Sequence, residues 1–467
     1  MMQMLVLWTD GLLFGLLGCV LVAAWRARHS EPVAAAWRRV GANGLGMAAL
    51  TVLLVFLLIG LLDSLHYRQV LKPAAPGQAV QLSTEVYSAL DALLEPLRIH
   101  TEKTYSEPLA IRLFSKETVE GADGVQRREF PRLRYGGAHL AYPDADYAGD
   151  MAGRLGLGFA MGGGLWLVLS LACTLGVMGA RKIAFGVAWR AIWRARGGVN
   201  WRAVLLVLGA LCLVGGPLAA LATGYHVFGT DKVGQDVLYL SLKSIRTALL
   251  IGTLTTLVTL PLAVALGVMA GYLGGWVDDV IQYIYTVLNS IPSVLLIAAS
   301  VLMIQVLIDT HPEWFATAAE RSDARLLALC VIMGMSSWTS LCRLLRGETL
   351  KLRELEYVQA ARAFGVSTRH ILARHVLPNL MHLVLIALVM DFSGLVLAEA
   401  VLSYVGIGVD ASTISFGSMI NAARMELSRE PMVWWSLCAA FSLMLLLVLS
   451  ANLFSDVVQE AFDPRQS

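Results

Sequence analysis

The sequence has few charged residues and few cysteines for its length. Asp, Glu, Lys and Arg make up 15% of its 467 residues and hydrophobic types make up 57%, whereas a soluble domain carries roughly 25% charged residues. This shortage of charge excludes a soluble multi-domain enzyme and a disordered chain. The net charge of +2 gives no reason to expect a nucleic-acid partner. The six cysteines lie in or beside apolar runs, so we expect neither a disulfide framework nor a Cys-x-x-Cys metal site.

Sequence motifs for catalysis are missing as well. No Gly-Lys dipeptide occurs, so the chain has no phosphate-binding loop of the G-x-x-x-x-G-K-[ST] type. The zinc motif H-E-x-x-H and the nucleophile motif G-x-S-x-G are absent, and the nine histidines are scattered. We therefore expect no catalytic residue, no bound cofactor and no metal site in this chain.

The sequence instead contains long apolar runs. A membrane-spanning helix needs about 20 mostly apolar residues, and nine such runs lie near 4–24, 44–63, 155–179, 203–223, 245–270, 281–308, 326–345, 380–405 and 433–455. They predict an all-α polytopic membrane protein with about nine transmembrane helices. The first run carries Asp10 and lacks a basic start, so we expect a retained span rather than a cleaved signal peptide.

The basic residues of the loops predict the orientation of the chain. Lys and Arg are in excess in the loops 25–43, 180–202 and 346–379, whereas 309–325 and 406–432 hold more acids than bases. Cytoplasmic loops carry the excess of positive charge. We therefore expect the N-terminus outside and the C-terminus in the cytoplasm.

The one large polar segment, residues 64–154, then lies outside the membrane. Its apolar residues have a helix-like spacing over 80–97, a strand-like piece covers 109–114, and turns are expected at 121–124 and 136–137. The segment is long enough for a small core of its own. It predicts a small mixed α/β extracytoplasmic domain whose ligand the sequence does not reveal.

A cytoplasmic hairpin is predicted over 352–379. Residues 354–364 favour a helix, Gly365 a left-handed cap, and Ser367 or Thr368 the start of a second short helix that Pro378 ends. From composition alone, an amphipathic connector on the lipid headgroups is the favoured interpretation. The motifs of the surrounding sequence change that preference.

Five motifs between residues 203 and 467 resemble those of the dipeptide, oligopeptide and nickel ABC import permeases. They are QAA with the glycine of 359–365, FGTDKVGQDVL at 228–238, AGYLGGWVD at 270–278, LAEAVLSYVGIG at 397–408 and DPR at 463–465. The first is similar to the EAA loop of that family, which usually has Glu where Gln359 stands and an aliphatic residue where His375 stands. The second has Gln235 where the family has Arg.

The resemblance implies a permease core of six spans over 203–467, preceded by an added module. That module comprises two spans in 1–63, the outer domain 64–154, and a third span with a basic loop over 155–202. The resemblance further implies a non-catalytic permease subunit in a bacterial inner membrane. Its partners would be a second homologous permease subunit, two ATPase subunits that bind ATP and Mg, an external substrate-binding protein and membrane lipid.

In that family the EAA hairpin is the coupling helix that contacts the ATPase. The implied ATPase contacts are Glu356, Tyr357, Gln359, Ala360, Ala361 and Gly365, and the hairpin is tied to its span through Ser367 and Pro378. The outer-loop motif supplies Gly229, Thr230, Asp231 and Asp236.

Two acids at membrane depth are candidates for the translocation path. Asp391 and Glu399 lie eight residues apart, about two helical turns, so they share roughly one face. One interpretation is that they hold the amino terminus of a peptide. The other is that Asp391 pairs with a neighbouring helix and that Glu399 lies near water at the outer end. For Glu399 the second interpretation is favoured.

Peptides are the expected substrate, with nickel chelates, oligosaccharides or another small solute as alternatives. A membrane receptor with an external sensor domain is disfavoured because no cytoplasmic segment is long enough for an effector domain. The added module could dock the substrate-binding protein or brace the partner permease.

Overall fold

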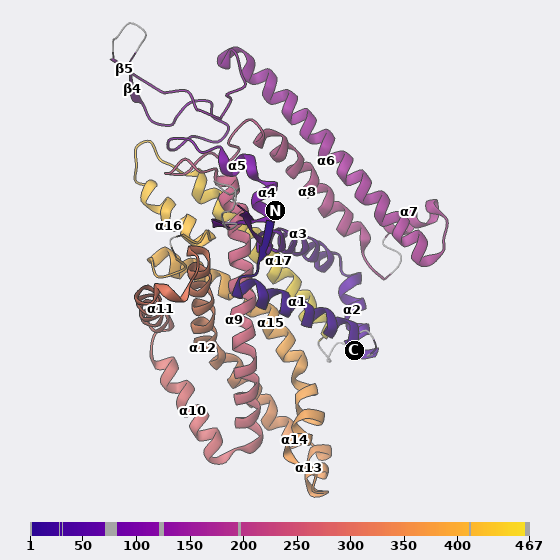
Figure 1. Cartoon of the computed structure of the whole chain (residues 1–467). Coiled ribbons are helices and arrows are strands. Elements are labelled where there is room, and N and C mark those ends of the chain that lie inside the picture. Colours follow the sequence, from indigo (N-terminus) through magenta and orange to yellow (C-terminus); the bar gives the residue numbers. More distant parts are fainter. Residues whose placement is uncertain are drawn as a thin grey trace, which may run out of the picture.

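The computed structural model describes residues 2–27, 29, 31–70, 82–120, 126–194, 198–410 and 412–462. Within these residues, nine helical segments are long and apolar enough to cross a membrane. They are α1 (Trp8–Ala27), α3 (Gly44–Ser64), α6 (Pro143–Arg181), α8 (Trp201–Ala222), α9 (Val237–Leu273), α11 (Ser293–Thr310), α12 (Ala318–Arg353), the continuous segment Thr368–Val405, and α17 (Trp435–Phe462) (Figure 1). The predicted all-α polytopic fold is confirmed.

Shorter helices join or flank these segments. They are α2 (Glu31–Ala42), α4 (Ala89–Leu93), α5 (Glu95–Ile99), α7 (Phe185–Trp193), α10 (Gly275–Ser290), α13 (Glu356–Ala363), α14 (Thr368–Ile371), α15 (Leu377–Val405), α16 (Phe416–Glu426) and the 3-10 turn Pro312–Trp314. The expected single span over 281–308 is wrong in one respect. Its chain is broken between α10 and α11, where Pro292 fixes an extended conformation just before α11.

Two small sheets involve the polar segment 64–154, which we call the outer segment. Strands β1 (Met2–Leu5), β2 (His66–Val70) and β3 (Leu82–Ser88) form one antiparallel sheet, and β4 (Glu117–Glu120) pairs with β5 (Gln126–Glu129). The helix expected over 80–97 is therefore wrong for residues 82–88, which pair with β2, and right only near α4 and α5. No strand forms over 109–114, where the single bridge of Arg112 with Arg132 is described. The turn expected at 121–124 and the motif at 463–465 lie outside the described residues.

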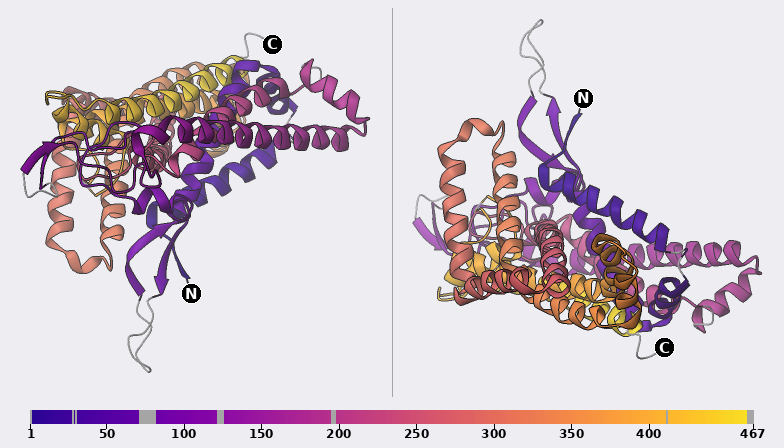
Figure 2. Two further views of the ribbon diagram at one scale, coloured as in Figure 1. Left: turned by 90° about the horizontal axis from the view of Figure 1, so that it is seen from above. Right: turned by 90° about the horizontal axis from the view of Figure 1, so that it is seen from below.

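The N-terminal strand joins this outer segment. Because β1 pairs with β2, the start of the chain lies on the same side of the spans as residues 66–142. Figure 2 shows β1 and α1 together on one side of the molecule, with the sheet projecting from the helical body. Helix α6 begins at Pro143, twelve residues before the expected span, and so extends into the outer segment.

Helices α6 and α8 pack side by side as a hairpin (Figure 1). Glycines form the seam: a Cβ atom on Gly158 would lie 2.4 Å from the Cα of Pro217, and one on Gly162 would lie 2.2 Å from the carbonyl oxygen of Cys212. Such close backbone approach is how small residues associate helices in lipid. The indole N–H of Trp166 donates to the carbonyl oxygen of Leu205 (2.8 Å) and fixes the register.

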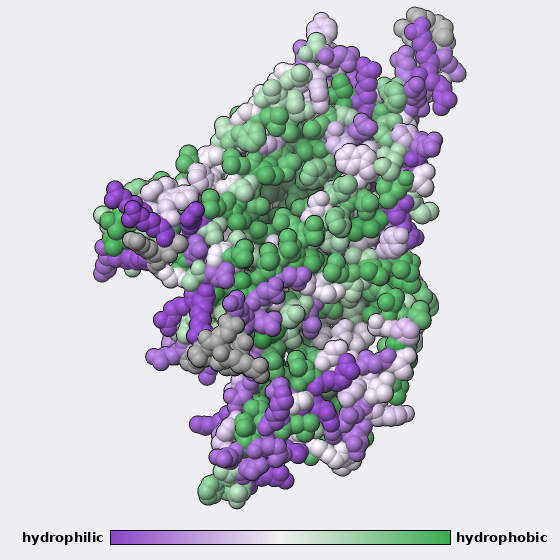
Figure 3. All heavy atoms as spheres, turned by 180° about the vertical axis from the view of Figure 1, so that it is seen from behind, coloured by the Kyte–Doolittle hydropathy of each residue, from purple (hydrophilic) through white to green (hydrophobic). Residues whose placement is uncertain are grey.

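The added module and the remainder of the chain share one hydrophobic cluster. Buried Phe56 of α3 and Tyr105 of the outer segment pack in the same cluster as Val237 of α9, Phe416 of α16 and Trp435 of α17. Elsewhere apolar side chains cover the outside of the spans, and Figure 3 shows them across the middle of one face, between hydrophilic edges. The first 200 residues are therefore not a detached domain.

Candidate functional site

The hairpin over 352–379 links α12 to the next long helical segment. Helix α12 ends at Arg353 and α13 follows after a two-residue turn. Helix α13 ends because Gly365 has φ +74°, a left-handed conformation that glycine adopts without steric penalty. The amide N–H of Gly365 donates to the carbonyl oxygen of Arg362 and that of Val366 to the carbonyl oxygen of Ala361 (3.1 Å each). The glycine cap is the one that the sequence predicts.

The second half of the hairpin differs from the prediction. Helix α14 passes through the π-helical turn Leu372–Val376 directly into α15, so Pro378 does not stop the helix. Pro378 lies in the first turn of α15, and the wider π turn before it accommodates the missing proline N–H. Ser367 occupies the N-cap position of α14, but its side chain makes no capping hydrogen bond.

The hairpin presents most of the predicted contact residues to its surroundings. Exposed residues are Glu356, Tyr357, Gln359, Ala360 and Gly365, and Ala361 is half-buried. The hairpin is held from beneath by Val358, Ile371 and Val376, which are at most 2% exposed. The sequence-based set misses Phe364, which is 88% exposed at the tip of the hairpin. Its position directly before the capping glycine is the only signal for it in the sequence.

Polar contacts connect the hairpin to both neighbouring spans. The Nδ2 of Asn379, in α15, donates to the hydroxyl oxygen of Tyr357 (3.0 Å). A guanidinium N–H of Arg353 donates to the carbonyl oxygen of Tyr272 at the end of α9 (3.3 Å). Gln359, which replaces the usual Glu, donates to the side chain of Glu354 (3.2 Å) and so closes on its own helix start.

A bidentate ion pair joins α10 to α12 on the hairpin side of the membrane. The Nε of Arg346 lies 2.6 Å from Oδ1 of Asp278, and its second nitrogen lies 2.7 Å from Oδ2. Two parallel hydrogen bonds of this kind fix orientation as well as distance. The ion pair ties α10 to α12, which leads directly into the hairpin.

The two candidate acids of α15 have different surroundings. Glu399 is 1% exposed and accepts hydrogen bonds from the hydroxyls of Ser403 (2.6 Å) and Ser415 (2.9 Å). The expected contact of Glu399 with water is therefore wrong: the side chain is buried and ties α15 to the start of α16. Asp391 is half-buried and has no hydrogen bond or ion pair with any described residue.

The outer-loop motif binds the added module. Gly229 has φ +71°, and a Cβ atom there would lie 2.4 Å from the carbonyl oxygen of Ser106. The hydroxyl of Thr230 accepts from the amide N–H of Ser106 (2.7 Å) and donates to the carbonyl oxygen of Thr104 (2.8 Å). The carbonyl oxygen of Thr230 accepts from the indole N–H of Trp435 (2.9 Å). In this chain the motif is a joint between two parts of the fold.

The two aspartates of the motif shape the turn that leads into α9. Asp231 accepts amide N–H bonds from Val233 (2.9 Å) and Gln235 (2.8 Å). Asp236 caps α9 by accepting from the amides of Leu238 (2.8 Å) and Tyr239 (3.2 Å). The carboxylate of Asp236 satisfies amides that would otherwise lack partners at the helix start, and that of Asp231 fixes the turn before it.

A buried histidine that the sequence did not single out completes this joint. His226 contacts Asp236 through Nδ1 (2.8 Å) and Glu102 through Nε2 (3.4 Å). Burial alone lowers the pKa of His226, but its bonds to the two carboxylates raise it to about 9. Burial alone raises the pKa of Glu102, but bonds from His226 and from the amides of residues 134–136 lower it to about 2. We call His226, Glu102 and Asp236 the outer joint.

A second buried group of charges, the α1 ion cluster, comprises Asp10, Arg246 and Asp323. A guanidinium nitrogen of Arg246, in α9, lies 2.6 Å from Asp10 of α1 and 3.9 Å from Asp323 of α12. Asp10 also contacts Nδ1 of His66 (2.8 Å), and Asp323 accepts from the amide N–H of Thr9 (3.1 Å). The cluster fastens the added module to two helices of the core.

A neighbouring ion group repeats this arrangement. Lys243 of α9 lies 3.1 Å from Asp63 at the end of α3 and 2.8 Å from Asp91 in the outer segment. Asp91 also accepts from the hydroxyl of Tyr239 (2.7 Å). The outer half of α9 is therefore bound to the added module through ions on two successive turns.

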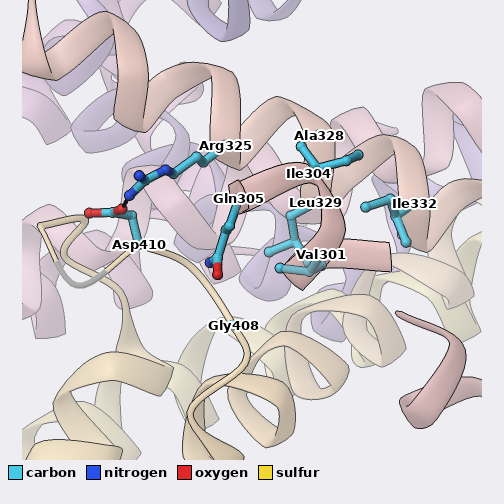
Figure 4. Close-up of a pocket in the computed structure, with 9 residues that line it drawn as sticks. All are labelled: Val301, Ile304, Gln305, Arg325, Ala328, Leu329, Ile332, Gly408 and Asp410. Carbon is cyan, nitrogen blue, oxygen red and sulfur yellow. Dashed lines mark ion pairs between the residues drawn. The ribbon is translucent and has the colours of Figure 1, made fainter. Parts of the chain in front are cut away.

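The outer ends of α11 and α12 close around a small cavity (Figure 4). It is lined by apolar side chains such as Val301, with Gln305 and Arg325 at its polar end. Arg325 forms ion pairs with Asp410 and Asp309. The cavity measures about 10 Å³, room for about one water molecule, so no solute fits between these helices in this state.

Comparison with known proteins relates this architecture to transport. Residues 263–467 match the family described as binding-protein-dependent transport system inner membrane component. The chain is 30% identical over 239 residues to the oligopeptide transport system permease protein OppC of Mycobacterium tuberculosis, which covers 51% of this chain and 76% of that protein.

Two further relatives are similar over the same length. The chain is 30% identical over 244 residues to OppC of Haemophilus influenzae (52% of this chain, 71% of that protein). It is 28% identical over 242 residues to the dipeptide transport system permease protein DppC of Lactococcus lactis (52% and 64%). The hairpin and α15 lie inside the family match, and residues 1–262 lie outside it.

Proposed function

This chain belongs to the binding-protein-dependent transport system inner membrane components, and on that premise we propose that it forms half of a translocation path for dipeptides or oligopeptides. It is a transmembrane permease subunit of an ATP-binding-cassette importer and a multi-pass membrane protein. The names of its relatives, oligopeptide and dipeptide permeases, support a peptide as the substrate.

One observation carries the proposed coupling to ATP hydrolysis: the second half of the hairpin, after the Gly365 cap, continues into a spanning helix without a break. Residues Thr368–Val405 form a single helical segment of 38 residues. A displacement of α14 is therefore transmitted along α15 to its outer end, as rigid-body alternating access requires. The exposed tip at Phe364 lies four residues before this segment begins. The hairpin is the proposed contact with an ATPase subunit.

The proposal assigns catalysis to other chains. ATP and Mg bind to two ATPase subunits, and this chain itself hydrolyses nothing. A second homologous permease subunit forms the other half of the path, and an external substrate-binding protein delivers the peptide. The orientation proposed is N-terminus outside and C-terminus in the cytoplasm of a bacterial inner membrane, which agrees with the pairing of β1 with the outer strand β2.

Asp391 is the proposed contact of this chain with the substrate. Its carboxylate is half-buried and has no partner among the described residues, although charged side chains at membrane depth normally have one. The protonated amino terminus of a peptide is a group that a free carboxylate would bind.

The first test is purification of the chain with a tag at its C-terminus in mild detergent, followed by mass spectrometry. We expect a second multi-span permease and Walker-motif ATPases to co-purify; a folded chain that purifies alone contradicts the proposal. The purified complex is then reconstituted in vesicles with its binding protein and ATP. Accumulation of a labelled dipeptide supports peptide transport, and accumulation of a nickel chelate without peptide overturns it.

A further inference from the structure

A cationic and aromatic segment closes the α6–α8 hairpin at the end remote from the outer segment. Between Asp150 and Asp231 the sequence contains no Asp or Glu. Within the described residues of this stretch, Lys182, Arg190, Arg194 and Arg202 are exposed around α7. Their positive charge has no acidic residue nearby in the chain to offset it.

Helix α7 has one face packed and one face open. Ala188 (0% exposed) and Ile192 (3%) pack in a cluster with Val177 of α6 and Leu205 of α8. The open face presents Phe185 and Trp189, one turn apart, whose rings stack with centroids 6.5 Å apart. Arg190 and Arg194 are also one turn apart and form a second exposed stripe.

The open face continues the lipid-facing surface of α6. Helix α7 begins four residues after α6 ends at Arg181, and α8 starts at Trp201, so α7 lies where two spanning helices leave the bilayer. Figures 1 and 2 show it at the far end of α6, beside the start of α8. In Figure 3 it forms the projection at the left edge, beside the apolar surface. The exposed side chains of α6 along that surface are Leu165, Leu167, Val168, Leu171 and Leu175.

We propose that α7 is an interfacial helix whose Arg190, Arg194 and Lys182 bind the headgroups of anionic phospholipids. Aromatic side chains on one face and bases on another are the features of helices that lie in the headgroup layer. Each base near an anionic membrane surface strengthens binding roughly fivefold. An acidic protein would satisfy the bases but not the Phe185–Trp189 face, which is continuous with lipid-exposed α6.

The test measures which lipids the full chain retains. The protein is reconstituted with equal parts of phosphatidylcholine and phosphatidylglycerol, extracted in mild detergent, and its bound lipids are quantified by mass spectrometry. We expect severalfold enrichment of phosphatidylglycerol. In Arg190→Gln/Arg194→Gln the enrichment should fall at least fivefold, whereas Arg190→Lys/Arg194→Lys should keep it. The matched control Lys116→Gln/Arg128→Gln removes two exposed bases from the outer segment and should change nothing.

Several outcomes overturn the proposal. Equal phosphatidylglycerol enrichment in wild type and in the glutamine double variant means that α7 is not the lipid site. No enrichment in wild type means that the bases of α7 bind an acidic protein instead. Wild type also provides a readout that does not depend on the variant folding. Its enrichment should decrease as NaCl rises from about 0.05 M to about 0.5 M, and insensitivity to salt contradicts a headgroup site built from bases.

Discussion

Phe364 is the most exposed large hydrophobic side chain among the described residues, at 88%, and it stands at the tip of the hairpin. A buried aromatic anchor contributes about 2 kcal/mol or more to an interface, roughly a thirtyfold change in affinity. We expect Phe364→Ala to reduce ATP-driven uptake at least tenfold and to release the ATPase during purification. The thermal unfolding temperature of the isolated chain should be unchanged because the side chain makes few contacts within it. Tyr142→Ala, 74% exposed in the outer segment, is the control; normal uptake by Phe364→Ala removes this residue from the interface.

Two glycines test how much the outer turn depends on close backbone approach. Gly234 has φ +81° and a Cβ atom there would lie 1.9 Å from the carbonyl oxygen of Glu102, whereas Gly275 has φ +54° and open space around it. We expect Gly234→Ala to lower the thermal unfolding temperature clearly more than Gly275→Ala, whose penalty is conformational only, about 1 kcal/mol. Equal effects of the two substitutions mean that the contact with Glu102 is dispensable.

At this scale the sequence predicts residues with a local role and misses those with distant partners. The helix cap at Gly365 depends only on neighbouring residues, and the sequence predicts it correctly. His226 has one partner ten residues away and the other, Glu102, 124 residues away. No feature of the sequence around His226 indicates that it contacts Glu102. The sequence places Glu399 near water because it does not reveal the contact with Ser415, the N-cap residue of α16, sixteen residues further on.

Among the connections between elements, the outer joint should respond to pH. The pKa of His226 is raised from 6.5 to about 9, so its stabilising effect is complete below pH 6.5 and is lost as the pH rises through 9. The pKa of Glu102 is lowered from 4.5 to about 2, so its effect is complete above pH 4.5 and is lost in acid. We expect the highest thermal stability between pH 4.5 and 6.5, with an alkaline decline that His226→Asn removes. An unchanged alkaline slope in that variant rejects His226 as the titrating group.

The α1 ion cluster is the connection between α1 and α9. Asp10 is fully buried, and its removal leaves Arg246 with one ion-pair partner among the described residues, Asp323 at 3.9 Å, beside the hydroxyls of Ser64 and Thr9. Breaking one partner of a buried ion pair costs about 3–5 kcal/mol, whereas replacing both by apolar residues is far less harmful. We expect Asp10→Asn to lower the unfolding temperature strongly and Asp10→Leu/Arg246→Met to recover most of the loss. A double variant that is no better than the single one argues against direct pairing.

Hydropathy predicts the elements well and their interruptions poorly. The nine runs correspond to the nine spanning segments described. Proline misleads in both directions: Pro292 breaks an apolar run that was expected to be one helix, and Pro378 lies in a helix that it was expected to end. The difference lies in the turn before each proline, extended in one case and π-helical in the other. Whether the turn before a proline is extended or π-helical depends on tertiary packing, which cannot be predicted from composition.

For the whole molecule, the shared cluster and the ion groups bear on the role of the first 200 residues. Deletion of 1–200 removes both carboxylate partners of Lys243, and it removes Asp10 from Arg246 and Glu102 from His226. It also exposes the cluster around Val237. We expect the remaining chain to fail in assembly with the partner permease, as a brace would require. The affinity of the assembled complex for the substrate-binding protein separates the bracing role from the docking role. Loss of that affinity with intact assembly favours a docking role for the module.

The pairing of Asp10 with Arg246 also has a consequence for biosynthesis. The two residues are 236 positions apart, so α1 is synthesised long before Arg246, whereas His66, the other partner of Asp10, follows after 56 residues. An unpaired carboxylate opposes the insertion of a spanning helix, by about 3 kcal/mol at the helix centre and by less in the first turn, where Asp10 lies. We expect the insertion of α1 to be completed only after α9 has been made, and a pulse-chase experiment should find its protease protection completed only after residue 246 has been synthesised.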